Sequence, residues 1–318
     1  MFTEFEACDN GVAYENLKNL SSRQSILCEM RALELREMAM AAAKLAKEMY
    51  DEGYGIYEIL GMIADHLASS QPEIHGDCMV EHLSLIRSYL SSSGAVDGAV
   101  FASCFLDCLK SFGISVSEVD FLSTGRLSGR IAYLKNALSD EAFDVFSQDF
   151  EDPRVYYVSS FKEACAAVRD GVCEYCILPF EEKGGARLGS ISSLIYHDDL
   201  KINSVTPVFG PDNSADVKYA LLSKQFTVPN IQEGDDRYLE VLFEESDGKE
   251  LSGILSAAGA LSVSIFRINS ISFETEDGTN PFVSIVFKSG ASDFSVLLIY
   301  LTLYYGSYTA VGIYKNLE

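Results

Sequence analysis

The chain has 318 residues, 48% hydrophobic content and a formal net charge of −23. This length allows two or three domains, and the apolar content is ordinary for a globular protein. The acidic excess argues against sequence-independent binding to nucleic acid or an anionic membrane, because both need basic patches. The acidic start, MFTEFEACDN, resembles no targeting peptide, and the longest apolar run, FSVLLIYLTLYYG, is too short to span a bilayer. We therefore expect a soluble cytoplasmic protein with neither nucleic-acid nor membrane partners.

Residues 1–125 are predicted to form a helical domain. Helix-forming residues dominate 16–50, and DEGYG at 51–55 interrupts them. Apolar spacing indicates further helices over 56–67, 80–90 and 100–112. Cys104 and Cys108 share a face of the last helix, where small buried thiols are the simpler interpretation and metal ligation the alternative. Without an export signal, all eight cysteines are expected to be free thiols with no metal.

Strands alternate with helices over residues 130–226, after a predicted linker STGRLSGR at 123–130. The segments RIAYL, RVYYV, YCILP, KINSVTPV and DVKYALLS are predicted strands. SDEAFDVFSQDF is a predicted helix with Ser139 as its cap, and SFKEACAAVRDG is one with a capping box at Ser160 and Glu163 and a stop at Gly171. SISSLIYHDD is a third predicted helix. This order predicts a parallel or mixed α/β sheet.

The stretch CEYCILPFEEKGGARLGSI contains two cysteines three positions apart and a glycine-rich loop. Cys173 follows a helix stop and Cys176 lies in a strand, whereas a thioredoxin-type pair begins a helix, so we do not favour a redox site. The loop leaves the carboxyl end of a strand and precedes a helix, which is where open α/β sheets bind ligands. A plain glycine-rich connection is the alternative.

The C-terminal part, residues 237–318, follows a polar linker TVPNIQEGDD at 227–236. RYLEVLFE is a predicted strand with Leu239, Val241 and Phe243 on one face, and KELSGILSAAGAL is an amphipathic helix. VSIFRINSISFET and PFVSIVFKS are a hairpin around EDGTN, SDFSVLLIYLTLYYG is a helix and TAVGIYK is the last strand. The order β-α-β-β-α-β is that of the split, ferredoxin-like pattern.

Taken together, residues 130–318 resemble the prephenate dehydratase family with its C-terminal ACT regulatory domain. The segments that carry the resemblance are RIAYL, SFKEACAAVRDGVCEYCILPFEEKGGARLGSI, HDDLKINSVTPV, DVKYALLS and GSYTAVGIYKN, which occur in the family's order. The resemblance implies a periplasmic-binding-protein-like α/β lobe over 130–226 and an ACT-like βαββαβ domain over 237–318, besides the helical domain. The expected fold class is thus α/β and α+β.

The family's catalytic motifs are altered in this sequence. Its Gly-Pro-x-Gly-Thr turn is matched by residues 135–138, and its Glu-Asn-Ser by Glu181, Glu182 and Lys183. Its Thr-Arg-Phe, whose Thr is thought to assist departure of the ring hydroxyl, is matched by Val217, Lys218 and Tyr219. Valine cannot donate a proton, and lysine lacks the bidentate fork of arginine. If the chain is an enzyme, the candidate catalytic residues are Ser139, Glu181 and Lys218.

The family's second lobe lies between the strands matched here by KINSVTPV and DVKYALLS. In this sequence only FGPDNSAD, residues 209–216, fills that gap, which is too short for a strand–helix–strand unit. We therefore expect one α/β lobe and no complete substrate cleft.

The resemblance also implies ligand sites and self-association. Family members usually bind phenylalanine at two ACT segments at a dimer interface, matched here by residues 249–251 and 269–272. We expect a small aromatic or carboxylate ligand, no cofactor and no metal, and a homodimer or homo-oligomer formed through the ACT-like sheet or through VLLIYLTLYY. The candidate ligand-binding residues are Asn136, Lys183, Gly184, Gly185, Lys249, Leu251 and Asn269.

Three hypotheses for function follow. The first is a regulatory or ligand-binding relative of prephenate dehydratase, in phenylalanine metabolism, that has lost catalysis. The second is an active dehydratase, a carbon–oxygen lyase that converts prephenate to phenylpyruvate, water and CO2. Bifunctional relatives carry a chorismate mutase at the N-terminus, but GIYEILGMIADHL has neither Arg nor Lys, so solvated helix cations are the simpler interpretation of Arg23, Arg31, Arg36 and Lys44. The third is a scaffold for oligomerisation.

Overall fold

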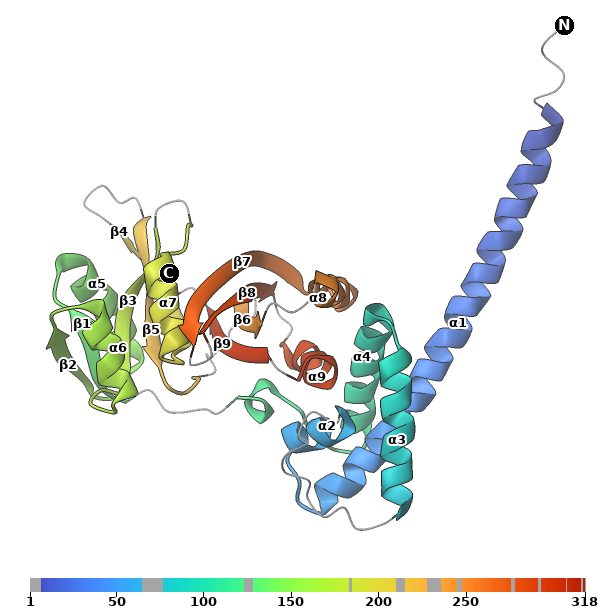
Figure 1. The fold of residues 1–318 in the computed structure, drawn as a ribbon, viewed down its shortest axis with the longest axis horizontal. Coiled ribbons are helices and arrows are strands. Elements are labelled where there is room, and N and C mark those ends of the chain that lie inside the picture. The colour runs from blue at the N-terminus through green and yellow to red at the C-terminus, as the bar shows by residue number, and fades with distance from the viewer. Residues whose placement is uncertain are drawn as a thin grey trace, which may run out of the picture.

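The structure is a computed structural model of the chain, and Figure 1 shows its three regions, coloured from the N-terminus to the C-terminus. It describes residues 7–64, 77–122, 128–182, 185–209, 215–227, 236–244, 248–275, 278–290, 293–306, 308–315 and 317. A helical region comes first, an α/β region lies at the opposite end of the molecule, and a βαββαβ unit lies between them.

The N-terminal region consists of the helices α1 (Ala7–Asp51), α2 (Ile56–Ala64), α3 (Asp77–Ser92) and α4 (Ala95–Ser111). These are the helices that the apolar spacing predicts, although the first begins nine residues earlier than expected (16 − 7 = 9). The break after α1 comes from Gly53, whose φ of 103° lies in the region that favours glycine. Within the described residues, no helix is both long enough and apolar enough to cross a bilayer.

The α/β region forms one end of the sheet. Its strands are ordered β2-β1-β3-β5-β4, with β1 parallel to β2 and β3, and with β5 antiparallel to β3 and β4. As predicted, β4 and β5 pair directly, and only residues 210–214 separate them. The elements are β1 (Gly129–Leu134), α5 (Ala137–Phe146), β2 (Pro153–Val158), α6 (Phe161–Arg169), β3 (Tyr175–Glu182), α7 (Gly189–His197), β4 (Lys201–Phe209) and β5 (Ala215–Ser223).

Two helix ends in this region test the predicted caps. Ser160 caps α6 by accepting a hydrogen bond from the backbone N–H of Glu163, as predicted. The prediction that Ser139 caps α5 is wrong. The cap is Asn136, three residues earlier, whose Oδ1 accepts the N–H of Ser139 at 3.0 Å. Asn and Ser are both good caps, and the turn here starts at the first of them.

The C-terminal region has the predicted βαββαβ order. Its strands lie in the order β9-β6-β8-β7, with all neighbours antiparallel, which is the ferredoxin-like topology. Leu239, Val241 and Phe243 do share the face of the sheet that packs against its helices. The elements are β6 (Arg237–Glu244), α8 (Gly248–Ala260), β7 (Ser264–Thr275), β8 (Gly278–Ser289), α9 (Ser295–Tyr304) and β9 (Tyr308–Lys315).

One feature of the sheet was not predicted. Strand β4 of the α/β region pairs in parallel with β9, so that the two regions form a single nine-stranded sheet. The contact joins Ile202 to Gly312, and a Cβ at Gly312 would come within 2.8 Å of the Ile202 side chain. Glycine therefore permits this close approach. The domain limits at 125, 130–226 and 237–318 stay predictions.

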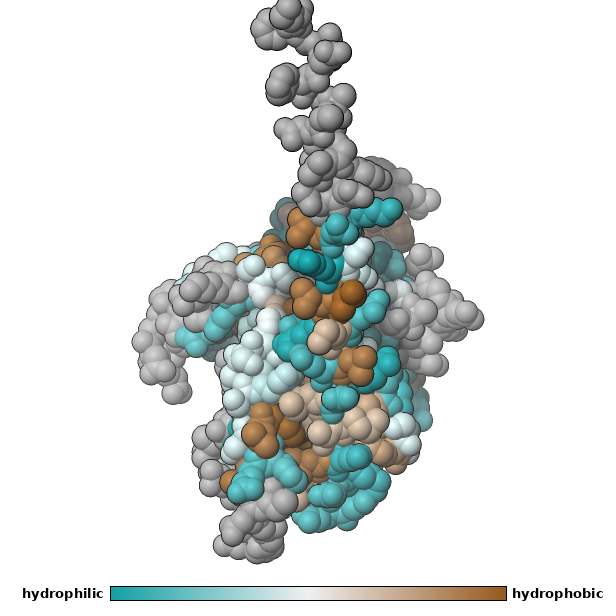
Figure 2. Space-filling view, turned by 90° about the vertical axis from the view of Figure 1, so that its right-hand side faces the viewer, coloured by the Kyte–Doolittle hydropathy of each residue, from teal (hydrophilic) through white to brown (hydrophobic). Residues whose placement is uncertain are grey.

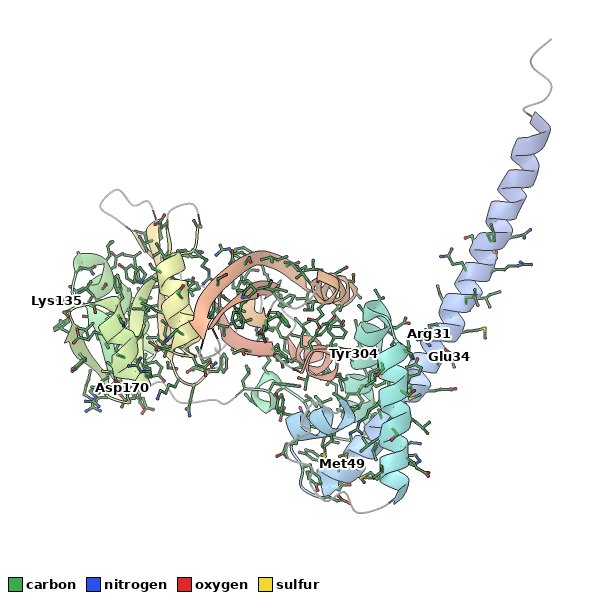
Figure 3. The ribbon with its side chains drawn as sticks, in the orientation of Figure 1. Arg31, Glu34, Met49, Lys135, Asp170 and Tyr304 are labelled. Atoms are coloured by element: carbon green, nitrogen blue, oxygen red, sulfur yellow. The ribbon has the colours of Figure 1, made fainter. Side chains whose placement is uncertain are left out.

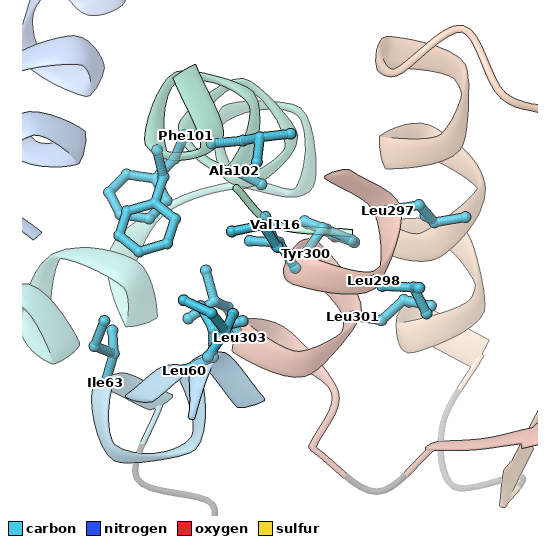
Figure 4. Packing of buried hydrophobic residues seen from close by; sticks show 14 of the residues in the cluster. Leu60, Ile63, Phe101, Ala102, Val116, Leu297, Leu298, Tyr300, Leu301 and Leu303 are labelled. Atoms are coloured by element: carbon cyan, nitrogen blue, oxygen red, sulfur yellow. The ribbon is translucent and has the colours of Figure 1, made fainter. Parts of the chain in front are cut away.

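The largest difference concerns α9, the apolar VLLIYLTLYY segment. We expected it to leave an exposed surface for self-association, but it is covered by the chain's own N-terminal helices. Leu298, Ile299 and Leu301 are fully buried, and Figure 4 shows Tyr300 and Leu303 packed among Phe101 of α4 and Leu60 of α2. Gly98 of α4 allows Tyr304 to approach closely, because a Cβ there would meet its ring at 2.7 Å. The helical region and the βαββαβ unit therefore share one core.

A buried ion pair connects these two regions outside the apolar core. Glu118 belongs to a single 3₁₀ turn after α4 (Glu118–Asp120), and its carboxylate pairs with the guanidinium of Arg237 at the start of β6. Its second oxygen accepts the backbone N–H of Phe294 at 2.8 Å, just before α9. Both side chains of the pair are less than a tenth exposed. Removal of one partner would leave the other charge buried without compensation.

We therefore predict that Arg237→Met lowers the free energy of unfolding by about 3–5 kcal/mol, the usual cost of breaking a buried pair. Arg154→Met is the matched control, because Arg154 pairs with Asp152 while 65% exposed, and such pairs contribute about 1 kcal/mol or less. Urea unfolding of both variants measures the difference. Equal, small losses would show that the Glu118–Arg237 pair does not hold the two regions together.

Candidate functional site

The candidate catalytic residues Glu181 and Lys218 meet where the α/β region joins the βαββαβ unit. They lie on paired strands, β3 and β5, beside an irregularity in the register between Pro179 and Glu181. Lys218 Nζ lies 3.6 Å from one carboxylate oxygen of Glu181. The other oxygen accepts a hydrogen bond from Arg267 of β7 at 2.7 Å and lies 3.2 Å from Nε of Arg187. Three cations therefore surround this one buried carboxylate.

Arg187, in the loop after β3, links Glu181 to a second buried carboxylate, Glu240 of β6. Its guanidinium donates to Glu240 at 2.7 Å and to the hydroxyl of Tyr314 at 3.1 Å, and it stacks 3.4 Å from the ring centre of Phe180. Burial alone would lower the pKa of Arg187, but Glu240 and the other anionic groups around it outweigh burial and raise it. Arg187 is thus a permanent charge in this cluster.

Glu240 is completely buried and has two further hydrogen-bond donors. The hydroxyl of Tyr196 on α7 donates at 2.6 Å, and that of Ser284 on β8 donates at 2.9 Å. Burial and the neighbouring carboxylate raise the pKa of Tyr196, which keeps the hydroxyl protonated as a donor. We call Glu181, Arg187, Lys218, Glu240 and Arg267 the ion cluster. It connects β3, β5, β6 and β7, and its carboxylate oxygens are all engaged by protein groups.

Ser139, the third candidate catalytic residue, lies elsewhere. It is fully buried in α5, where its hydroxyl accepts a hydrogen bond from Asn136 at 2.9 Å. The Ser139 side chain also forms a hydrogen bond with the Tyr219 side chain. Tyr219 and Lys218 are neighbours on β5, and successive side chains of a strand point to opposite faces. Ser139 is therefore separated by the sheet from Glu181 and Lys218. The three residues do not form one catalytic arrangement.

The predicted ligand-binding residues are also dispersed. The side chain of Asn136 is used in capping α5 and in a hydrogen bond to the carbonyl of Leu134. The N–H of Gly185 donates to Glu182, and its carbonyl accepts from Arg267 at 2.8 Å, so this residue offers the loop no free anion-binding group. Lys183 and Gly184 lie outside the described residues.

The two ACT-like segments lie on different faces of the sheet. Leu251 of α8 packs at the edge of the core that faces the helices. Asn269 of β7 is paired with Ser284 of β8, and directly paired residues share a face of the sheet. The Ser284 hydroxyl donates to Glu240, so this is the face away from α8 and α9. Lys249 lies in α8, and its side chain is outside the described part of the chain. A single copy of the chain therefore does not bring these residues to one site.

The two cysteines of CEYC are buried. Burial raises the pKa of Cys173, and a hydrogen bond with Cys165 together with burial raises that of Cys176. Raised thiol pKa values are the opposite of what a reactive redox cysteine needs. The six cysteines that the structure describes are free thiols, and among the described residues no cluster of three or more His, Cys, Asp or Glu could hold a metal.

We accordingly predict that native protein treated with iodoacetamide at pH 8 is modified at the exposed Cys28 long before Cys173 or Cys176. The two buried thiols should react only after denaturant is added. Mass mapping of the alkylated peptides gives the order. Equally fast labelling of Cys173, or a Cys173–Cys176 bridge in untreated protein, would contradict the assignment.

A groove with a volume of about 560 Å³ lies between α4 and the α8–α9 side of the βαββαβ unit. Its walls combine apolar and polar side chains, and the exposed side chains of Lys110 and Asp293 line it. Ser262, at a φ of 57°, lies at the end of α8 in the same lining. No sequence motif indicates this groove, because its residues come from three distant segments. They include Val100, Ser103, Cys104, Leu106, Leu261, Val263, Val296 and Leu297.

No protein-family model matches the sequence, and no curated protein matches it. Among solved structures, prephenate dehydratase from Streptococcus mutans is similar over 59% of this chain and 99% of its own, at 16% identity and a TM-score of 0.46. Prephenate dehydratase from Arthrobacter aurescens, in complex with L-Phe, is similar over 58% of this chain and 89% of its own, at 13% identity and a TM-score of 0.42. GqqA, described as a quorum quenching acylase, is similar over 58% of this chain and 94% of its own, at 18% identity and a TM-score of 0.42. At TM-scores below 0.5, these likenesses decide nothing about the activity of the chain.

Proposed function

We propose that this protein is a regulatory or ligand-binding relative of prephenate dehydratase, in phenylalanine metabolism, that does not catalyse the dehydratase reaction. The observation that supports this most is the ion cluster. Glu181 and Lys218 stand where the family's motifs would be, and the Glu181 carboxylate is paired with Lys218, Arg187 and Arg267. A substrate would have to displace one of these cations before it could contact the Glu181 carboxylate.

The surroundings of the cluster support the same proposal. A general acid must reach the leaving group, and Val217, at the position of the family's threonine, has no proton to give. The short connection 210–214 replaces the family's second lobe, so one wall of the family's cleft has no counterpart here. Exclusion of water and positioning of the substrate depend on such a wall.

We predict that the purified protein shows no enzymatic conversion of prephenate to phenylpyruvate at neutral pH. Loss of a positioned general acid costs about two to four orders of magnitude, and Val217→Thr with Lys218→Arg should not restore activity because the second lobe is missing. Phenylpyruvate absorbance in alkali measures the product. Turnover at an ordinary enzymatic rate that Lys218→Ala abolishes would establish the active dehydratase instead.

The groove between α4 and α8–α9 is the better candidate for a ligand site within one chain, since the ACT-like positions lie on two faces of the sheet. A cation and a carboxylate beside apolar side chains suit a small amphipathic molecule such as an aromatic amino acid. Lys110 would pair with the ligand's carboxylate and Asp293 with its ammonium group.

We predict that phenylalanine raises the melting temperature of the protein, because a ligand at 100 times its Kd stabilises the folded state by about 2.7 kcal/mol. Prephenate and chorismate are the comparison ligands. Lys110→Glu should abolish the shift, and Lys224→Glu, which reverses an exposed lysine outside the groove, should leave it intact. If none of the three compounds shifts the melting temperature, the scaffold hypothesis gains over ligand binding.

Self-association is part of this proposal, but α9 is no longer its surface. Strand β7 is the outer strand of the sheet and exposes Ile265, Phe266 and Ile268, each more than a third accessible. An exposed apolar edge strand is a template for pairing with another strand. Phe266→Glu tests whether two copies meet there.

A further inference from the structure

Helix α1 continues well beyond the part of it that packs against the rest of the molecule. Its buried side chains begin at Leu35 and include Ala39, Ala42, Ala46 and Met49, which belong to the core shared with α2 and α4. Figure 1 shows the N-terminal half of α1 projecting from the body, and the labelled Arg31 and Glu34 in Figure 3 mark where it leaves. Arg31 pairs there with Asp97 of α4 at 3.0 Å.

The projecting half exposes large apolar side chains. Leu20, Ile26, Leu27, Met30 and Leu33 are between 57% and 64% accessible. Figure 2 shows hydrophobic side chains alternating with hydrophilic ones along this helix. At 100° per residue these five lie on one side of α1, roughly 130° around the helix from the side that packs in the core. The stripe is therefore not a continuation of the packed face, and the body of the same chain cannot cover it.

We propose that this stripe pairs with the same stripe of a second copy of the chain, with the two α1 helices antiparallel and crossing at Met30. The two-fold axis then places Met30 against Met30 of the partner subunit, and Leu27 against the partner's Leu33. At the margin of this pairing, Leu20 comes level with the partner's Met40, whose side chain is 36% exposed. The contacts nearest the two-fold axis, Met30 with the partner's Met30 and Leu27 with the partner's Leu33, are thus apolar against apolar, as a self-complementary interface requires, while Ile26 comes level with the partner's Glu34.

The charges on the stripe select the antiparallel arrangement. Arg23 and Glu37 are exposed, and each lies seven residues from Met30 on the same side of the helix. Antiparallel pairing about Met30 places Arg23 opposite the partner's Glu37, and the symmetry repeats this pair. Parallel pairing would instead place Arg23 against the partner's Arg23 and Glu37 against the partner's Glu37, and like charges in such positions repel.

The geometry leaves room for both bodies. The helix extends 21 residues from Met30 to its last residue, Asp51 (51 − 30 = 21), a rise of about 30 Å. In the antiparallel arrangement the bodies lie at opposite ends of the crossed pair. The ion pair between Arg31 and Asp97 is retained, because it lies on the side of α1 that faces α4.

Sedimentation equilibrium on the full chain at micromolar concentrations tests the proposal. The wild type should have twice the mass of one chain, and Met30→Glu should have the mass of one chain because it places two carboxylates at the crossing point. The matched control is Leu85→Glu, since Leu85 of α3 is 65% exposed outside the stripe. It should remain a dimer.

A charge exchange tests the orientation. Arg23→Glu should weaken the dimer at least tenfold, and Arg23→Glu combined with Glu37→Arg should restore it. In a protein with Cys8, Cys28 and Cys78 replaced by serine, Met30→Cys should form an intermolecular disulfide on oxidation, while Leu85→Cys should not. A wild-type monomer, a dimer that survives Met30→Glu but dissociates with Phe266→Glu, or a monomer that instead binds vesicles of anionic lipid through α1 would each overturn the proposal.

Discussion

The structure depends on one buried guanidinium. Arg187 lies between Glu181 of the α/β region and Glu240 of the βαββαβ unit, and it touches the ring of Phe180 as well. The strand pairing between these regions is slight, since β4 and β9 meet at one residue pair, so side chains must fix their arrangement. An ion pair in a dry interior is costly to form, but its directional hydrogen bonds accept only one geometry. The cluster therefore contributes specificity of arrangement more than net stability.

The same interaction restricts what the protein can do chemically. Acid–base catalysis needs a side chain that can give or accept a proton at the substrate, and here the carboxylates of Glu181 and Glu240 are paired with cations of the protein. The ion cluster thus occupies the place where the resemblance to prephenate dehydratase would locate catalysis. A binding function makes no such demand on these residues, because the groove beside Lys110 and Asp293 lies on the other side of the βαββαβ unit. Structural use of Glu181 and Lys218 and ligand binding in the groove are compatible.

The sequence predicts the elements of this fold well and the site only in part. Apolar spacing locates the helices and strands because each obeys a local period, and the βαββαβ order follows from them. Arg187, Glu240 and Arg267 were missed because they come from separate elements and meet only in the folded chain. One signal was present: Glu240 interrupts the otherwise apolar face formed by Tyr238 and Leu242 in a strand buried on both sides. A charged residue at such a position requires a buried partner, and the sequence does not say which.

The surface expected for self-association, α9, is buried in the structure, and the sequence missed this for a related reason. Composition identifies α9 as too apolar to face water, but it does not say whether another copy or the same chain covers it. The N-terminal helices cover it, and a helix that packs by one face over its C-terminal half is free to carry a different apolar face further along. In α1 the small residues Ala39, Ala42 and Ala46 let the helix lie close to α4, while the large residues from Leu20 to Leu33 remain outside. The residues that build the monomer and those available to a second copy thus lie on different sides of one continuous helix, so association need not disturb the core or the groove.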